Sequence, residues 1–441
     1  MDDPSGAAGC SRTRRATGVT RAADARVHWV KDYLRTRCFG AGPPPNGPLT
    51  FGAELELLAF DAARRTIAPI AARDGEGCSL DAVRDVARRR SWRETISDKG
   101  VPTFTSAGGG SLTFEPGGQL EYASAVHGSV DGVITELREV EAHLRESAER
   151  VGITLHTCGV DPFNGAESAP LQLDAPRYRR MAEYFASIGP DGARMMRQTA
   201  SLQINVGGIG ALKRWPVANA IAPWLVALFA NSSRYAGHDT QCASYRAETW
   251  RGVDARRTGV FGAEDAVHVY TAFVLAAPAF LADDAAPPYG ELGDDRISDS
   301  TLATHLTTLF PEVRPRGGYL ELRSLDAGDD AHRRAAMSLV AGVLGDWDAA
   351  RDALDLIGAA DADLLRRAGR AGMRDERLAS LAGDLLTIAA AGCARLGSEI
   401  VSEESLGSVT ALNRGGPDRS PRPSQTSETF AARTSSVIDS C

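Results

Sequence analysis

The stretch "SLTFEPGGQLEYAS" (residues 111–124) has the pattern of two strands joined by a Pro-Gly-Gly turn. Apolar and polar residues alternate on both sides of the turn, as they do in strands with one buried face. Glu115 lies at the start of the turn and Glu121 lies after it. The pattern predicts a hairpin that holds two carboxylates close together, with glycines that leave space for a ligand.

Three further segments alternate with the same period: "GAELELLAF" (52–60), "SLQINV" (201–206) and "YLELRSL" (319–325). Side chains two residues apart in a strand share one face, so each segment has an apolar side and a polar side. The polar sides carry Glu54, Glu56, Gln203, Asn205, Glu321 and Arg323. A sheet with one side in water shows the same alternation, so a solvated face is the alternative interpretation of any single strand.

Helical periodicity is clearest over residues 128–150, where apolar residues recur at helical spacing before Gly152. Because strands are scattered among helices without regular β-α-β alternation, the sequence predicts an α+β fold with an antiparallel sheet. The predicted helices cover residues 24–37, 79–90, 128–150, 176–187, 215–231, 265–282, 298–309, 330–355 and 373–396.

The 441 residues carry a net charge of −8, which argues against a general affinity for nucleic acid or anionic membranes. The seven cysteines include no C-x-x-C pair, which suits a reducing, cytoplasmic compartment. None of the three lysines follows glycine and precedes serine or threonine, which excludes a P-loop. The apolar runs at 217–230 and 271–282 are short and interrupted by proline, so we expect buried helices rather than membrane spans.

Both ends of the chain are rich in small and polar residues and have few large apolar ones. Such segments cannot offset the entropy of ordering. The sequence therefore predicts disordered tails at 1–20 and 413–441. No Pro- or Ser-rich linker and no repeat interrupts the region between them, which predicts a single domain over residues 21–412.

Several glutamates on one sheet face would repel one another unless a divalent cation neutralised them. Carboxylate oxygens suit Mg²⁺ or Mn²⁺, and the chain has neither His-x-x-x-His nor paired cysteines to favour zinc. We therefore expect a magnesium or manganese site on the polar face, to which Glu115 and Glu121 contribute.

The segment "SYRAETWRGVDARRTG" (244–259) places four arginines among aromatic and small residues without an obvious helical pattern. We expect a loop in which Arg246 and Arg257 contact an anionic substrate, because guanidinium groups bind carboxylate or phosphate through two parallel hydrogen bonds. The alternative is a solvated surface loop whose arginines pair with Glu248 and Asp254.

Four segments occur in a characteristic order: "FEPGGQLE", "MMRQTASLQINVG" (195–207), "SYRAETWRGVDARRTG" and "YLELRSLDA". As a set they resemble the glutamate-cysteine ligases of the plant and proteobacterial type, and most closely the actinobacterial relatives in the ergothioneine pathway. The resemblance extends from about residue 51 to about residue 327, and more loosely to about residue 400. One departure is Ala53, where many relatives carry another acidic residue.

The resemblance implies a fold related to glutamine synthetase, in which a curved antiparallel sheet forms a funnel with helices outside. It implies ATP, Mg²⁺ or Mn²⁺, L-glutamate and L-cysteine as ligands, and γ-glutamylcysteine as the product of a γ-glutamyl phosphate. The matching positions are Glu54, Glu56, Glu115, Glu121 and Glu321 for metal, Gln203 and Asn205 near metal and nucleotide, Thr199 and Arg246 in the amino-acid pocket, and Arg323 for phosphate.

Three alternatives remain open at this point. A ligase of the same scaffold with another amine acceptor would have the same sequence motifs in the part of the site that activates the carboxylate. A guanidine phosphotransferase would share the related fold, and a binding protein on a decayed scaffold would have lost catalysis. The sequence gives no oligomeric state, and we expect a monomer slightly more than an assembly.

Overall fold

The structure is a computed structural model that describes residues 24–40, 47–72, 77–97, 100–262, 265–280 and 286–414. The tails predicted at 1–20 and 413–441 lie outside these residues, apart from residues 413 and 414 at the end of the last helix. One hydrophobic core includes residues from Val30 to Val409.

A nine-stranded sheet forms the centre of the molecule, and all its pairings are antiparallel. Across the sheet the strands are β12 (Val313–Arg316), β13 (Tyr319–Asp326), β7 (Ser201–Gly207), β1 (Thr50–Asp61), β5 (Leu120–Ala123), β4 (Ser111–Phe114), β3 (Pro102–Thr105) and β2 (Arg93–Ile96). A ninth strand, β6 (Ile153–His156), pairs with the second half of β1. The α+β prediction and the four predicted strand segments are confirmed.

The strand register brings the predicted polar residues together on one side of the sheet. Glu54 of β1 lies opposite Gln203 of β7, and Glu56 lies opposite Glu121 of β5. Glu321 of β13 lies opposite Asn205 of β7. Residues that are up to 267 positions apart in the sequence therefore form one polar face.

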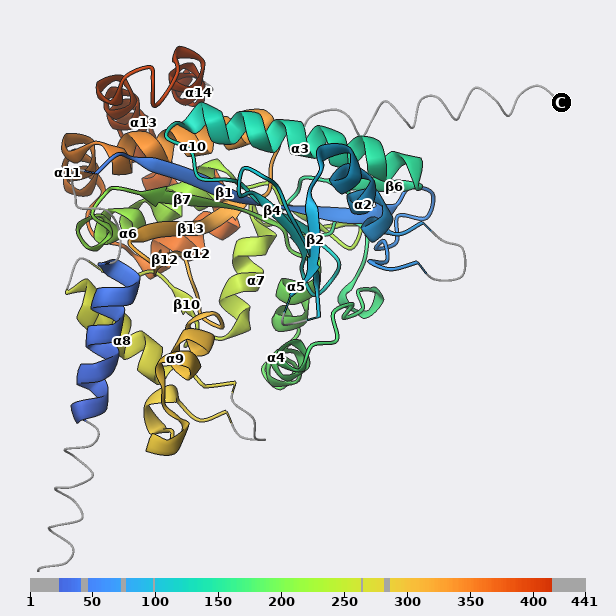
Figure 1. Ribbon diagram of the computed structural model, residues 1–441. Coiled ribbons are helices and arrows are strands. Elements are labelled where there is room, and N and C mark those ends of the chain that lie inside the picture. Colours follow the sequence, from blue (N-terminus) through green and yellow to red (C-terminus); the bar gives the residue numbers. More distant parts are fainter. Residues whose placement is uncertain are drawn as a thin grey trace, which may run out of the picture.

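The other side of the central strands is apolar and fully covered. Its members on β1 and β7 are at most 2% exposed: Ala53, Leu55, Leu57, Leu202, Ile204 and Val206. Helices α3 (Val130–Arg150) and α10 (Asp330–Gly345) contact β1 and β7 and lie along this side of the sheet (Figure 1). Helices α4 (Pro176–Ala186), α5 (Asp191–Gln198) and α7 (Tyr245–Val253) lie on the opposite side, where the polar face is (Figure 1).

Helix α3 shows how the sequence determines an element. Ser129 caps its first turn by accepting a hydrogen bond from the backbone N–H of Gly132. The apolar residues predicted at helical spacing, from Val130 to Leu144, are all at most 1% exposed. The helix therefore begins at Val130, two residues after the predicted start at residue 128.

The remaining helices complete the layer structure, and most of the predicted ones are confirmed. A helix over residues 24–33 continues as a π-helix, η1 (Leu34–Phe39). The others are α2 (Ser79–Arg90), α6 (Ala211–Leu228), α8 (Ala266–Ala276), α9 (Asp299–Leu306), α11 (Trp347–Ile357), α12 (Ala362–Ala371), α13 (Glu376–Leu396) and α14 (Glu403–Arg414). The single helix predicted over 330–355 is wrong, because Asp346 ends α10 and caps the first turn of α11.

Helix α7 corrects a second expectation, since residues 244–259 were predicted as a loop. Ser244 caps this helix by accepting a hydrogen bond from the backbone N–H of Ala247. Its buried side includes the polar residues Arg246 and Thr249, so hydrophobic periodicity does not reveal it.

Helix α13 is long and apolar enough, by length and composition, to cross a membrane. In the structure it packs against α10, α11 and α14. Its residues Leu378, Leu385 and Leu386 are buried in the hydrophobic core. This contact pattern is that of a core helix.

Candidate active site

The turn of "TFEPGGQLEY" places the two glutamates of the β4–β5 hairpin. The backbone N–H of Glu115 donates to the carbonyl of Gln119, and that of Gly118 donates to the carbonyl of Glu115, both at 2.9 Å. Gly117 lies against the backbone of Arg197, where a Cβ atom would come within 2.2 Å of the carbonyl oxygen. The glycine at 117 is therefore needed for the turn to pack on α5, which replaces our expectation that the glycines clear space for a ligand.

Four glutamates on the polar face have pKa values above their ordinary range. Burial raises the pKa of Glu54 and of Glu56 to about 7, with Glu321 adding to the effect on Glu54 and Glu115 adding to that on Glu56. Burial also raises the pKa of Glu115, and it raises that of Glu121 well above its usual value, with the charge of Glu115 as the next cause. The carboxylates are crowded enough that they cannot all ionise at neutral pH without a counter-charge.

Glu56 is oriented by two hydrogen bonds. Glu56 accepts from the backbone N–H of Ser201 at 2.7 Å and from the amide of Gln203 at 3.3 Å. The pKa values of Glu115 and Glu121 are both raised, chiefly by burial, and the charge of Glu115 adds to the effect on Glu121.

Glu321 has a different environment, because arginines surround it. Arg314 and Arg316 of β12 donate to its two oxygens at 3.1 and 3.2 Å, and Arg323 also donates to it. Burial acts to raise the pKa of Glu321, but the three guanidinium groups outweigh burial and hold that pKa at about 2. Glu321 is therefore already neutralised, and a cation at this residue has to compete with arginine.

The donor chemistry of the polar face fits a hard divalent cation. Within the described ranges, no three His, Cys, Asp or Glu side chains already form a metal cage. The raised pKa values of Glu54, Glu56, Glu115 and Glu121 nevertheless show an anionic site that lacks counter-charge, and oxygen is the donor that Mg²⁺ prefers. The side-chain oxygen of Asn205 on β7 is also buried, and it has no hydrogen-bond partner among the residues that the structure describes.

Gln203 and Thr199 connect the parts of the site. Gln203 accepts from Arg323 at 2.5 Å while its amide donates to Glu56, so it joins the carboxylate cluster to the arginines. Thr199 is buried, and its hydroxyl donates to the carbonyl of Met195. The Thr199 carbonyl accepts a 3.0 Å hydrogen bond from the side chain of Gln119, which ties the hairpin turn to the start of β7.

Arg246 projects from α7 toward the end of β13. Its guanidinium is 3% exposed and donates to the backbone carbonyl of Arg323 at 2.9 Å. Asp326 lies 4.0 Å from another of its nitrogens and also accepts from the hydroxyls of Ser232 and Ser244. Asp326 thus fixes both the first turn of α7 and the side chain that α7 presents.

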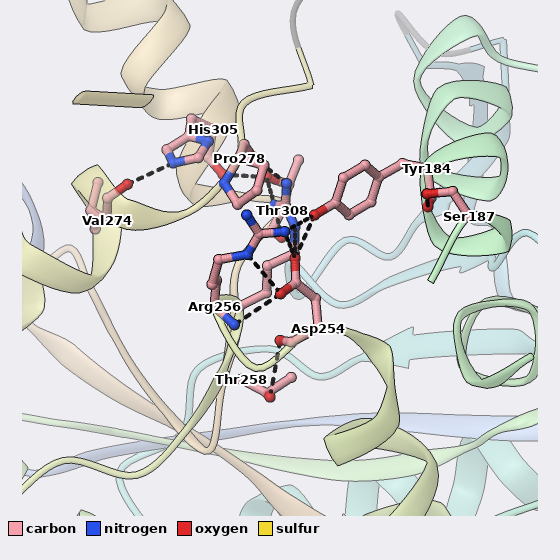
Figure 2. Close-up of polar contacts among 10 residues, drawn as sticks. Tyr184, Ser187, Asp254, Arg256, Thr258, Val274, Pro278, His305 and Thr308 are labelled. Atoms are coloured by element: carbon pink, nitrogen blue, oxygen red, sulfur yellow. Dashed lines mark hydrogen bonds and ion pairs between the residues drawn. The ribbon is translucent and has the colours of Figure 1, made fainter. Parts of the chain in front are cut away.

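The structure does not bring Arg257 to this cluster. Its side chain is fully buried, lies 3.8 Å over the ring of Phe280, and donates to the carbonyl and hydroxyl of Thr308. Figure 2 shows Asp254, Tyr184 and Thr308 close together at this place, with Tyr184 donating to Asp254 at 2.6 Å. Arg257 therefore holds the segments around Thr308 and Pro278 together.

The other arginines of the segment form the ion pairs expected in the alternative interpretation, although residues 245–253 are helix α7 and not a loop. Arg251 pairs with Glu248, and Arg256 pairs with Asp254 at 3.2 Å. Sequence reasoning also missed residues of the site. Arg314 and Arg316 alternate with apolar residues before the turn at Gly317, which is a strand signal, whereas Asp326 carried no signal of its own.

With this geometry described, comparison with known proteins identifies the family. The family model "Glutamate-cysteine ligase family 2 (GCS2)" matches residues 50–410. The chain belongs to this family. Glutamate-cysteine ligase EgtA of Mycolicibacterium smegmatis is 31% identical over 89% of this chain and 90% of its own length. The chloroplastic glutamate-cysteine ligase of Brassica juncea is 26% identical over 76% of this chain and 70% of its own length.

A solved structure agrees on the fold. A glutamate-cysteine ligase from Francisella tularensis in complex with AMP has a TM-score of 0.50 at 14% sequence identity, over 88% of this chain and 85% of that one. The glutamine-synthetase-like fold expected from the sequence is confirmed, with a sheet that is open rather than closed. The family ligase is an enzyme, so a decayed binding protein and a guanidine phosphotransferase are both set aside.

Proposed function

We propose that this ligase joins the γ-carboxylate of L-glutamate to the amine of L-cysteine through a γ-glutamyl phosphate formed from ATP. The supporting observation is that a crowded, under-neutralised carboxylate cluster lies beside the partly buried arginines Arg314 and Arg323 on one sheet face. The carboxylate cluster needs a cation, and the arginines need an anion. A metal-bound nucleotide together with an amino acid supplies both.

The roles of the residues follow from this charge arrangement. Glu54, Glu56, Glu115 and Glu121 would hold Mg²⁺ or Mn²⁺, and Glu321 would join them by exchanging an arginine for the metal. When bound, the metal neutralises the phosphates of ATP and so lowers the cost of bringing two anions together. Arg323, which donates to Gln203 at 2.5 Å, would contact the phosphoryl group in transfer.

Catalysis on this face consists of charge neutralisation and alignment. A glutamate γ-carboxylate oxygen attacks the γ-phosphorus of ATP and ADP leaves. The cysteine nitrogen then attacks the acyl carbon, phosphate leaves, and the nitrogen loses a proton. Arg246, 3% exposed and fixed by Asp326, would bind the α-carboxylate of glutamate during both steps.

The product γ-glutamylcysteine would enter ergothioneine synthesis in the cytoplasm. Two observations support this: the resemblance of four motifs to the actinobacterial enzymes of that pathway, and 31% identity over most of the chain to a mycobacterial relative. Deletion of the coding gene should deplete ergothioneine in the host. If the ergothioneine level is unchanged, the product supplies the synthesis of another thiol.

The test of the activity is direct. Purified protein is incubated with ATP, Mg²⁺, glutamate and one amine acceptor at a time, and products are read by mass spectrometry and by phosphate release. We expect γ-glutamylcysteine with cysteine and much slower turnover with alanine. Equal turnover with alanine would make this a ligase of the same scaffold with another acceptor. No product with any amine would overturn the proposal.

A further inference from the structure

The connection between β7 and α6 is rich in glycine and leads into a basic helical turn, since residues 207–214 read "GGIGALKR". Gly208 and Gly210 have φ angles of 76° and 64°, a conformation that glycine adopts without strain. No side chain caps α6, and the backbone N–H groups of Ala211 and Leu212 form no hydrogen bond within the described residues. The free N–H groups at the start of a helix attract negative charge.

Arg214 lies in the same helical turn and is buried without a counter-charge. Its side chain is 2% exposed, and in the part of the chain that the structure describes its guanidinium forms no hydrogen bond or ion pair. Long side chains of a helix point back toward the helix N-terminus, so Arg214 extends toward the free N–H groups. Burial lowers the pKa of Arg214 to about 10. A buried guanidinium without a partner costs folding stability, which a bound anion restores.

The acidic residue that acts on Arg214 is already engaged with other groups. This residue, Asp346, opposes the effect of burial on the pKa of Arg214. Its carboxylate accepts from the backbone N–H of Ala349 and from Arg395, both at 2.7 Å. The ammonium of Lys213 also has no acidic partner among the residues that the structure describes. Two neighbouring cations at the start of α6 therefore lack a counter-ion.

Trp347 at the start of α11 covers these two cations. Helices α6 and α11 are in contact (Figure 1). The guanidinium carbon of Arg214 lies 3.6 Å from the centre of the Trp347 ring, and the ammonium of Lys213 lies 5.6 Å from it. Trp347 is nevertheless 47% exposed, although tryptophan is buried to a large extent in most proteins. Its exposed part offers an apolar contact directly beside the cations.

We propose that the first turn of α6, with Lys213, Arg214 and Trp347, binds an oxyanion, namely the phosphate or carboxylate group of a small molecule. The guanidinium and ammonium groups supply positive charge, and the N–H groups of Ala211 and Leu212 supply further donors. Because Arg214 is covered, the Trp347 side chain rotates as the anion enters and then packs on the rest of the ligand. The site uses no residue of the polar face, so it is independent of the proposed function.

The test measures the binding of inorganic phosphate and of citrate to the full-length protein by calorimetric titration in EDTA at constant ionic strength. Arg214→Met removes the charge but keeps an apolar stem, so it should weaken binding at α6 about tenfold or more. Arg351→Met on the exposed side of α11 is the matched control and should bind both anions as the parent does. Anion that binds to the polar face is retained in every variant, so the difference from the parent isolates the α6 site.

Lys213→Met is a second variant, which should fold because the lysine is exposed, and it should weaken the same binding about threefold or more. If melting curves show that Arg214→Met is unfolded, this variant decides. Trp347→Phe should keep the binding and lose the change in tryptophan fluorescence that the anion causes in the parent.

The two anions identify the source of the oxyanion. Tighter binding of phosphate assigns a phosphate ester as the ligand, and tighter binding of citrate assigns a carboxylic acid. If the parent binds neither anion, or if Arg214→Met and Lys213→Met bind both as tightly as the parent, the inference is overturned.

Discussion

Glu54→Gln should stabilise the metal-free protein, and the stabilisation should grow as the pH rises. The pKa of Glu54 is about 7 in the folded protein against an ordinary value of 4.5, chiefly because the carboxyl is buried and secondly because Glu321 is close. Between these two values the unfolded chain ionises while the folded chain does not. Folding stability is therefore lost as the pH rises from 4.5 to 7.

The size of the effect follows from 1.36 kcal/mol for each pH unit in that window. Ionisation of Glu54 costs roughly 3 kcal/mol of unfolding free energy at pH 8 and less than about 1 kcal/mol at pH 5. Glutamine cannot ionise, so the advantage of the variant should increase by about 2 to 3 kcal/mol between pH 5 and pH 8.

The assay is urea unfolding in EDTA at pH 5, 6, 7 and 8, with Glu149→Gln as a control that should stay within about 0.5 kcal/mol of the parent throughout. Adding Mg²⁺ with ATP should shrink or reverse the advantage of Glu54→Gln, because the parent then regains its counter-charge. If the difference in unfolding free energy between variant and parent does not change with pH, the reasoning is refuted. Ionisation of Glu54 would then have no cost in folding stability.

Four further predictions concern other residues. Glu115→Gln and Glu121→Gln should nearly abolish turnover while the melting temperature without Mg²⁺ stays unchanged or rises; parent-like turnover across a Mg²⁺ titration would remove both from the metal site. Arg246→Lys should raise the KM for glutamate about tenfold and leave that for ATP unchanged, and a parallel rise of both constants would contradict the assignment. Arg257→Lys should lower the unfolding free energy by roughly 2 to 4 kcal/mol and leave both KM values unchanged. Burial lowers the pKa of His305 to about 4, so its contribution to stability is lost as the pH falls from 6.5 toward 4, about 2 kcal/mol at pH 5; His305→Gln should flatten the stability profile there.

The polar face could be predicted from the sequence because strand periodicity is strict. Once Glu54 and Glu56 are placed on one face, register is the only unknown, and the pairing with Gln203 and Glu121 resolves it. The hairpin at Glu115 was equally readable, since the Pro-Gly-Gly turn sits between two alternating strands. The metal ligand set stays a prediction.

Other features could not be read because they depend on tertiary context. Helix α7 buries a charged residue, Arg246, whose guanidinium donates to the carbonyl of Arg323 and lies 4.0 Å from Asp326, both on β13. Hydrophobic periodicity does not predict that a guanidinium is buried, because its acceptors lie on a strand that is distant in the sequence. For the same reason Arg246 and Arg257 looked equivalent in sequence, although Arg246 lies at the end of β13 and Arg257 packs over Phe280 and donates to Thr308.

The position of β1 at the middle of the sheet has a consequence during synthesis. This strand ends at residue 61, but its neighbour β7 ends at 207, and β13, which covers the free edge of β7, ends at 326. At about 5 to 20 residues per second, a ribosome needs roughly 13 to 53 s to make the intervening chain. Until then the apolar side of β1 has no completed sheet around it, so the nascent chain exposes a strand that invites aggregation. Efficient production of this enzyme should therefore depend on a chaperone that holds nascent chains, and slower translation should worsen that dependence.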